Sequence, residues 1–290
     1  MTPSIRRIVG LASLALVGST TASHAGPFIN LSITASDPAI TAWADALVDY
    51  APALDPSPVG TELSALGPAD NALVSLGDLD VAGVLAGDAP GSITLSFATP
   101  ITNGSGADLA VFENAFAFFP PDDAYIFAEL AFVEVSTNGV DFARFPNVSL
   151  NTEGALDPAT DILIPDFGGG PLRDFVGILT SNTNGLAGIH ELGLGTLFDL
   201  EELASDPLVV GGLLDLASVG FVRLVDIPGD GSVVDSLGNP MLDSFSTAAG
   251  FENAGFDLDA VGALYVVPEP GTGILLLTGL ALLAARERRT

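Results

Sequence analysis

Acidic side chains beside apolar strands are the residues of this sequence whose types and spacing could do chemistry. Most of the 36 acidic residues are expected to solvate the surface, but three groups adjoin strongly apolar stretches. Two carboxylates that lie close together repel each other unless a cation, a hydrogen-bond donor or water compensates their charge. The three groups are Asp108 with Glu113 around "LAVF", Glu129 within "FAELAFVEV", and Asp257 with Asp259 in "GFDLDAVGALYVV".

Calcium is the cation that suits these carboxylates, because Ca²⁺ takes about six to eight oxygen ligands from carboxylates and carbonyls. Alternation along a strand would place Asp257 and Asp259 on one face and Phe256, Leu258 and Ala260 on the other. We therefore hypothesise a structural Ca²⁺, the alternative being that the acids face water on outer strand faces. The hypothesised ligands are some of Asp108, Glu113, Glu129, Asp257 and Asp259.

The same carboxylates could also be read as a glycosidase pair. That mechanism needs two carboxyl groups ~5–10 Å apart across a cleft, a distance that a sequence does not supply. His190, the only histidine beyond the first 25 residues, lies in the glycine-containing loop "GLAGIHELGLGTLFDL". With no nucleophile-elbow motif and no second histidine for a metal hydrolase, a structural role is favoured, in a loop that could line a ligand groove. No catalytic residue is assigned, and the chain is not expected to be an enzyme.

Short strands separated by long turns must position these side chains. "GSITLSFA" (91–98) alternates apolar and polar residues, and "ADLAVFEN" (107–114) and "YIFAELAFVEVS" (125–136) follow it, the last ending at an Asn138-Gly139 turn. Without a βαβ rhythm, the pattern predicts a single antiparallel β-sandwich. Other expected elements are strands at 142–148, 174–179, 219–227 and 255–267, helical turns at 198–204, and, over 37–50, a helix capped by Asp37 or a strand from Ala46 to Tyr50.

Composition limits the partners and the chemistry. The chain has no cysteine, which excludes disulfides, zinc thiolate sites and a thiol nucleophile. Residues 26–267 hold 34 acidic residues against three arginines and no lysine, a formal net charge of −31. Nucleic acid is excluded as a partner, because its phosphates require cationic contacts. Hydrophobic residues make up 48% of the chain, including 17 phenylalanines, so a core can form.

The N-terminus has the three parts of a secretory signal. Arg6 and Arg7 precede an apolar stretch at 8–17, and small residues then end in Ser-His-Ala at position 25. A basic start, an apolar centre and small residues before the cut are typical of a signal peptide. The sequence predicts a signal peptide over 1–25, cut by signal peptidase after Ala25; a buried N-terminal helix is the alternative.

The C-terminus combines a Pro-Glu-Pro motif, a short apolar run and an arginine-rich end. The apolar run, Gly271 to Ala285, has 15 residues and would form roughly 22 Å of helix, short of the ~30 Å hydrocarbon core. This length favours a temporary hold over a lifelong anchor. Arginines stay on the cytoplasmic side, and prolines keep the preceding peptide extended. The motif residues are Pro268, Glu269 and Pro270, followed by Arg286, Arg288 and Arg289.

These parts, in this order, resemble the PEP-CTERM sorting signal of Gram-negative bacteria over residues 268–290. The resemblance implies that the chain is a substrate of an exosortase, a transpeptidase-like membrane enzyme associated with extracellular polysaccharide and biofilm production. It also implies export and a transient inner-membrane stage through a C-terminal transmembrane helix. The processed protein would then reside at the cell surface or in the extracellular matrix, without its apolar tail.

The middle of the chain is similar to a group of bacterial cell-surface proteins that often carry this tail. The stretches concerned are "GSITLSFATPITNGSGADLAVFENAF", "AELAFVEVSTNGVDFARFP", "GLAGIHELGLGTLFDL" and "GFDLDAVGALYVVPEP". The resemblance spans most of residues 43–267 and implies a jelly-roll sandwich like that of discoidin or galactose-binding domains. It implies a fold and a location rather than an activity.

The expected function is therefore that of an exported surface or matrix protein whose domain, residues 26–267, serves adhesion or matrix interaction, with Ca²⁺ as its one candidate cofactor. A carbohydrate-binding module for exopolysaccharide is the alternative, and a carboxylate-based glycoside hydrolase comes third. The expected partners are signal peptidase, an exosortase-like enzyme, exopolysaccharide, and the membrane before processing.

Overall fold

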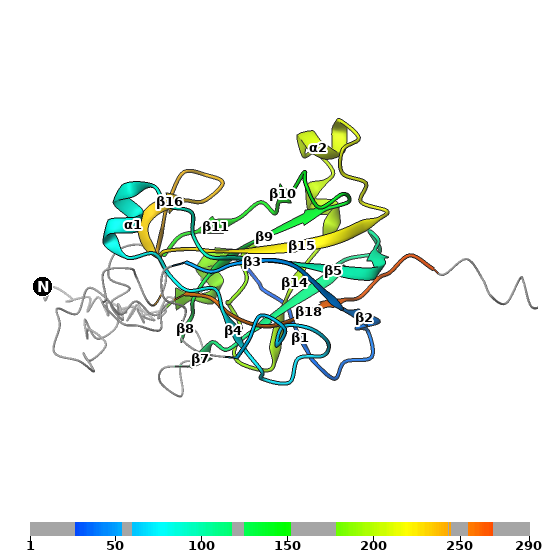
Figure 1. Cartoon of the computed structure of the whole chain (residues 1–290), viewed down its shortest axis with the longest axis horizontal. Coiled ribbons are helices and arrows are strands. Elements are labelled where there is room, and N and C mark those ends of the chain that lie inside the picture. The colour runs from blue at the N-terminus through cyan, green and yellow to red at the C-terminus, as the bar shows by residue number, and fades with distance from the viewer. Residues whose placement is uncertain are drawn as a thin grey trace, which may run out of the picture.

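The computed structural model describes residues 27–53, 60–117, 125–151, 178–242, 244 and 255–268. Within these ranges the protein is mainly β, with antiparallel sheets and few, short helices, consistent with a β-sandwich (Figure 1). No helix in the described ranges is long and apolar enough to span a membrane. The predicted signal peptide with Ala25, and the tail residues Glu269, Pro270, Arg286, Arg288 and Arg289, lie outside the described residues.

Two larger sheets form the body of the domain. The six-stranded sheet has the order β1-β14-β6-β18-β2, with β4 also paired to β18, and the five-stranded sheet has the order β10-β9-β15-β5-β3. The six strands of the first sheet are β1 Ser32–Thr34, β14 Leu194–Phe198, β6 Leu109–Glu113, β18 Asp257–Ala263, β2 Ala42–Trp43 and β4 Val74–Ser75. Those of the second are β10 Ala143–Arg144, β9 Ala131–Ser136, β15 Val219–Asp226, β5 Ser92–Ile101 and β3 Ala46–Ala51.

Smaller sheets and short helices complete the described part. The sheets pair β11 (Val148–Ser149) with β13 (Thr183–Asn184), β12 (Ile178–Leu179) with β8 (Tyr125–Phe127) and β7 (Phe116–Ala117), and β16 (Asp230–Val234) with β17 (Pro240–Leu242). The helices are α1 Val81–Ala86 and α2 Pro207–Val210, with 3₁₀ turns η2 Thr180–Asn182 and η3 Leu200–Leu203.

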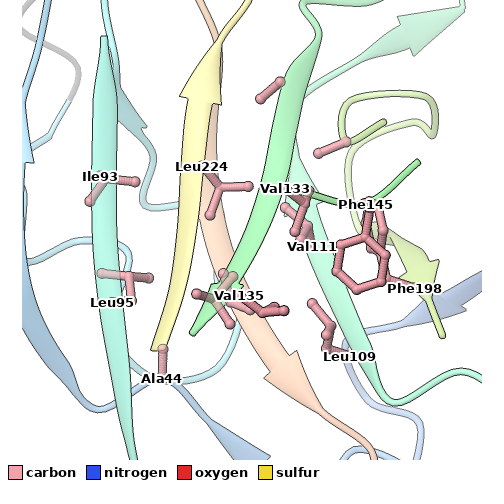
Figure 2. Close-up of a cluster of buried hydrophobic side chains, with 14 of the residues drawn as sticks. Ala44, Ile93, Leu95, Leu109, Val111, Val133, Val135, Phe145, Phe198 and Leu224 are labelled. Atoms are coloured by element: carbon pink, nitrogen blue, oxygen red, sulfur yellow. The ribbon is translucent and has the colours of Figure 1, made fainter. Parts of the chain in front are cut away.

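Apolar side chains from both larger sheets meet in one core. Ile93 and Leu95 of β5 and Leu224 of β15 come from the five-stranded sheet, and Leu109 and Val111 of β6 come from the six-stranded sheet (Figure 2). All five are buried, at 0–1% exposure. Burial of such side chains stabilises a fold by about 1.5–3 kcal/mol each, so this alternation of inward-facing residues holds the two sheets together.

The stretch predicted as one strand at 125–136 is two strands in different sheets, so that prediction is wrong. After β8, residues 128–130 leave the ladder: the Ala128 N–H donates to the Ser244 hydroxyl at 2.8 Å, and the Leu130 carbonyl accepts from the Ile227 N–H at 3.1 Å. The chain then enters the five-stranded sheet as β9. A continuous apolar run conceals this transfer, because both strands are buried on both faces.

Residues 142–148 and 37–50 also differ from expectation. The predicted return strand at 142–148 is limited to β10 and β11, and β11 pairs with β13 instead of β9. At 37–50 the predicted helix is wrong and the strand alternative is confirmed. The Asp37 carboxylate accepts from the Ala39 N–H at 2.9 Å and so closes a turn, after which β2 and β3 follow. The predicted helical turns at 198–204 are confirmed as η3, which Asp199 caps.

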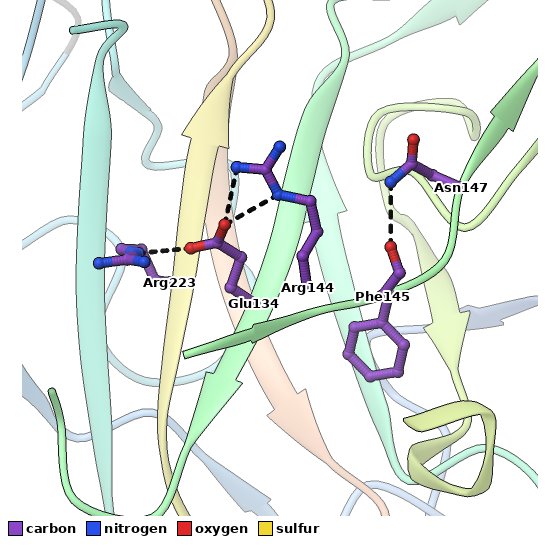
Figure 3. Close-up of polar contacts among 5 residues, drawn as sticks. All are labelled: Glu134, Arg144, Phe145, Asn147 and Arg223. Carbon is purple, nitrogen blue, oxygen red and sulfur yellow. Dashed lines mark hydrogen bonds and ion pairs between the residues drawn. The ribbon is translucent and has the colours of Figure 1, made fainter. Parts of the chain in front are cut away.

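Glu134 joins three strands on the outer face of the five-stranded sheet. Its Oε1 accepts from Arg144 Nε at 2.8 Å and its Oε2 accepts from Arg223 Nε at 2.6 Å (Figure 3). The two guanidinium groups lie over aromatic rings, Arg144 over Phe132 at 3.8 Å and Arg223 over Phe142 at 4.0 Å. Glu134 is 6% exposed at its side chain, whereas the arginines are 41% and 34% exposed.

We predict that Glu134→Gln lowers the free energy of unfolding by about 1–3 kcal/mol. Losing one partner of a buried charge pair costs more than that, but these arginines are partly exposed and water can solvate them. Urea denaturation measures the change. Asp141→Asn is the matched control, since Asp141 accepts only an exposed hydrogen bond from Asn138 among the contacts described. Equal stability of the two variants would contradict the role given to Glu134.

Candidate functional site

The five acids proposed from the sequence as calcium ligands are all buried. Their exposed fractions are 0% for Asp108, 2% for Glu113, 4% for Glu129, 9% for Asp257 and 1% for Asp259. The alternative that these acids face water on outer strand faces is therefore wrong. A buried carboxylate needs hydrogen bonds, a cation or a proton, so the partners of each one decide what it does.

Asp108 ties two loops to the start of β6. Its Oδ1 accepts from the Gly104 N–H at 2.6 Å and its Oδ2 accepts from the Leu200 N–H at 2.8 Å. Burial raises the pKa of the Asp108 carboxyl, and these two N–H groups oppose that effect. Both oxygens are occupied by the backbone, so Asp108 has a local structural function that accounts for its burial.

Asp259 lies at an irregularity in β18. Leu258 pairs with Glu113 while Ala260 pairs with Phe112, so the register shifts at Asp259. Phe256 and Leu258 face the main core, as do Val261 and Ala263 after the shift, and the simple alternation expected through Ala260 is therefore wrong. The core-facing residues of β18 are therefore even-numbered before the shift and odd-numbered after it.

The Asp259 carboxylate fastens a neighbouring loop to this irregularity. Its Oδ1 accepts from the N–H groups of Asp70 and Asn71, each at 3.1 Å, and Asn71 adopts a left-handed backbone conformation with φ 68°. Burial raises the pKa of Asp259, and the two N–H groups lower it. The loop before β4 is held to the sheet in this way.

Glu113 and Asp257 lie on the neighbouring strands β6 and β18, where Glu113 pairs with Leu258. Glu113 Oε2 accepts from the Ala115 N–H at 2.6 Å, and Asp257 Oδ2 accepts from Asn114 Nδ2 at 3.0 Å. Burial raises the pKa of Glu113 well above its ordinary value, with a further contribution from the charge of Asp257. The second oxygen of each group, Glu113 Oε1 and Asp257 Oδ1, is buried and has no hydrogen-bond partner.

Asp226 is a further buried carboxylate that the sequence interpretation missed. It is 1% exposed, its Oδ1 accepts from the Phe256 N–H at 2.8 Å, and its Oδ2 has no hydrogen-bond partner. Burial raises its pKa well above the ordinary value, and the charges of Asp78 and Asp257 add to the effect. Its position was recognisable in principle, because Asp226 shares the inward parity of Val222 and Leu224 in β15.

The five predicted ligands do not form one cluster. The charge of Asp257 contributes to the raised pKa values of Glu113 and Asp226, whereas Asp108 and Asp259 bind separate segments of the backbone. Glu129 lies between β8 and β9. Among the described residues, no group of three or more histidine, aspartate and glutamate side chains is arranged to hold a metal ion. The calcium hypothesis therefore remains a prediction, now confined to fewer residues.

His190 lies in the loop between β13 and β14, and its Nε2 is buried without a hydrogen-bond partner. Burial lowers the pKa of the imidazole, and a hydrogen bond to the backbone of Leu31 opposes this. Leu31 immediately precedes β1, so the imidazole attaches the entry of that strand to the loop. The same loop is bound to β9 by two hydrogen bonds between Ala131 and Ala187, at 3.0 and 3.3 Å.

Three aromatic side chains of the described part make packing contacts or hydrogen bonds within the domain. Trp43 contacts the Phe112 ring, with centroids 5.4 Å apart, and the Tyr50 hydroxyl donates to the Ser75 carbonyl at 2.7 Å. Tyr265 lies over Gly104, where a Cβ would overlap its ring. Each of these three side chains thus has a structural contact.

No protein-family model and no curated protein sequence matches the chain.

We predict that Gly188→Ala destabilises the protein by about 2 kcal/mol more than Gly193→Ala. Both glycines have left-handed backbone conformations, with φ 90° and 86°, so both variants bear the cost of that conformation. Only at Gly188 would the added Cβ overlap the Glu129 carbonyl oxygen, since nothing lies within 4 Å at Gly193. Thermal and urea unfolding give the difference, and equal losses would show that Gly188 does not lie against the Glu129 carbonyl.

We also predict that the protein is more stable in mild acid than at neutral pH. An acid with a raised folded-state pKa stabilises the fold fully below its unfolded pKa of about 4, and this stability is lost as the pH rises through the folded pKa. Glu113, Asp226 and Asp257 behave in this way. Unfolding free energies measured from about pH 4 upward should therefore decline, and Asp226→Asn should flatten the decline.

Asp235 provides a control whose contribution to stability depends on pH in the opposite direction. Hydrogen bonds from Ser149, Leu237 and Asn239 hold the pKa of its carboxyl below the ordinary value, despite the opposing effect of burial. Its contribution is present above the unfolded pKa and is lost as the pH falls, so Asp235→Asn should reduce stability at neutral pH. A pH profile that is the same for Asp226→Asn and the unaltered chain would contradict the assignment.

Proposed function

We propose that this protein is exported by a Gram-negative bacterium, sorted by an exosortase-like enzyme, and resident at the cell surface or in a biofilm matrix. In this proposal residues 26–267 form a jelly-roll-like adhesion or matrix-interaction domain, which a structural Ca²⁺ stabilises. Signal peptidase removes residues 1–25. Residues 268–290 are the PEP-CTERM signal, whose apolar helix holds the chain in the inner membrane until processing.

The main support for the proposal is the position at which the hydrogen bonds of the last described strand segment end, at Val267. After β18, Val266 bridges to Ile101, and the Val267 N–H donates to the Pro100 carbonyl at 2.9 Å. Pro268, the next residue, is exposed, and the described chain projects away from the sheets at this point (orange in Figure 1). The Pro-Glu-Pro motif thus begins directly after Val267, the last residue of the described part for which a hydrogen bond is seen, and a processing enzyme could bind it as an extended peptide.

The buried position of the acids favours a binding or structural domain over a hydrolase. The carboxyl groups of a glycosidase must flank a sugar in a cleft. Glu113, Asp226 and Asp259 are 1–2% exposed, so a polysaccharide has no route to them in this conformation. A carbohydrate-binding module remains the alternative, and binding of the organism's own exopolysaccharide on a glycan array would favour it.

Intact-mass analysis of the protein from culture medium and from membranes tests the sorting proposal. We expect a membrane-bound form that begins at Gly26 and retains residues 271–290, and an extracellular form that ends within residues 267–271. Replacing Pro268, Glu269 and Pro270 together by alanine should abolish the shorter form and leave the protein in the membrane. The matched control is the triple variant Pro207→Ala, Glu202→Ala and Pro240→Ala, which changes the same residue types elsewhere in the domain. Extracellular protein that always retains residues 271–290 would overturn the proposal.

A further inference from the structure

The chain that leads from β18 to the Pro-Glu-Pro motif is held against the end of β5. The Tyr265 carbonyl accepts from the Thr102 N–H at 3.1 Å, and the Val267 N–H donates to the Pro100 carbonyl at 2.9 Å. We call residues 265–267 the exit segment, which lies near the end of the orange ribbon in Figure 1. Its main chain is thus paired with the five-stranded sheet, whereas β18 belongs to the six-stranded one.

Side chains fasten the exit segment as well. Val266 bridges to the fully buried Ile101 and packs against the main core. The Tyr265 ring lies so close over Gly104 that a Cβ there would overlap it, and the Tyr265 hydroxyl donates to the Ser105 carbonyl at 3.3 Å. The exit segment is therefore part of the folded domain, although it follows the last strand.

The sorting signal begins directly after this fastened segment. The three residues of the Pro-Glu-Pro motif, 268–270, separate it from the apolar run that starts at Gly271, and three fully extended residues span at most about 11 Å. A membrane enzyme would have to bind its substrate between the bilayer and the folded sheet. Extended peptides are bound through main-chain N–H and C=O groups, and the Tyr265 C=O and the Val267 N–H are already engaged with the sheet.

We propose that the exit segment controls processing, because the sorting enzyme cuts the chain only after residues 265–267 leave β5. This inference rests on the proposed function and adds its regulation. The fold and the enzyme compete for the same main-chain groups, so local opening of the exit segment precedes cleavage. The pairing of β18 with β6 ends at Ala263 and is not part of this opening.

A disulfide between positions 101 and 266 tests the inference. The hydrogen bonds flank this antiparallel pair, so its Cα atoms are expected to lie ~4.5 Å apart, within the ~4.4–6.8 Å range of disulfides. Because the chain has no cysteine, Ile101→Cys combined with Val266→Cys yields one defined bond. The anchored precursor, residues 26–290, is purified in detergent and incubated with membranes of the producing bacterium. Intact mass then follows the loss of residues 271–290.

We expect the oxidised double variant to resist cutting, and a reductant to restore cutting to the rate of the two single-cysteine controls. Equal cutting of the oxidised double variant and these controls would overturn the inference. If no precursor is cut, whether oxidised or reduced, the proposed sorting itself is rejected, and this inference with it.

Loosening the exit segment should have the opposite effect. Tyr265→Ala removes the ring over Gly104 and should raise the rate of cutting several-fold, whereas the control Tyr265→Phe keeps the ring and should leave the rate nearly unchanged. Hydrogen exchange of the Val267 amide reports the opening without any enzyme, and it should be faster in Tyr265→Ala and slower in the disulfide variant. Faster exchange without faster cutting would overturn the inference.

Discussion

The interior of this domain depends on main-chain N–H groups as the partners of buried carboxylates. Asp108, Asp226 and Asp259 each accept from an N–H of a segment remote in sequence, and each thereby ties a loop or a strand end to a sheet. Buried backbone groups outside regular ladders need partners of this kind. The buried acids therefore supply hydrogen bonds to the backbone of the connecting segments, as strand pairing does within the sheets. The apolar core between the two sheets can then remain continuous.

This arrangement follows from a composition that lacks cations. With both arginines of the described part bound to Glu134, the buried acids are left with hydrogen bonds, protons or metal ions as sources of compensation. Where two N–H groups reach the carboxylate, as at Asp108, the group has a sufficient structural explanation. Where one oxygen has no hydrogen-bond partner, as at Glu113 and Asp226, burial raises the pKa of the carboxyl and favours its protonated form.

Patterns with a local physical cause were predictable from the sequence. The strands at 91–98, 107–114 and 219–227 follow from alternation or apolar runs, and the η3 turns follow from the Asp199 cap. The exit of residues 128–130 from one sheet into another has no local signal, since it depends on the distant partners Ser244 and Ile227. The short pairings of β10, β11 and β13 are likewise set by tertiary contacts.

The candidate site shows the same division between local and distant causes. An acid next to an apolar strand can be recognised in sequence, and so Glu113 and Asp257 were identified. Asp226 was missed although it shares the inward parity of Val222 and Leu224, so the alternation along β15 was a signal that could have identified it. The register shift at Asp259 also has no sequence signature, yet it decides which residues of β18 enter the core.

The binding of the two arginines to Glu134 has a consequence for the resistance of the fold to proteolysis. Trypsin-like proteases cut after lysine or arginine in a peptide that they bind in extended form. In the described part of the chain, Arg144 and Arg223 are the only such residues, and both are ion-paired, stacked on phenylalanine rings and placed in hydrogen-bonded strands. Cleavage after Arg144 or Arg223 would require the sheet to open first, so one glutamate that binds two arginines also protects these two sites from this class of protease.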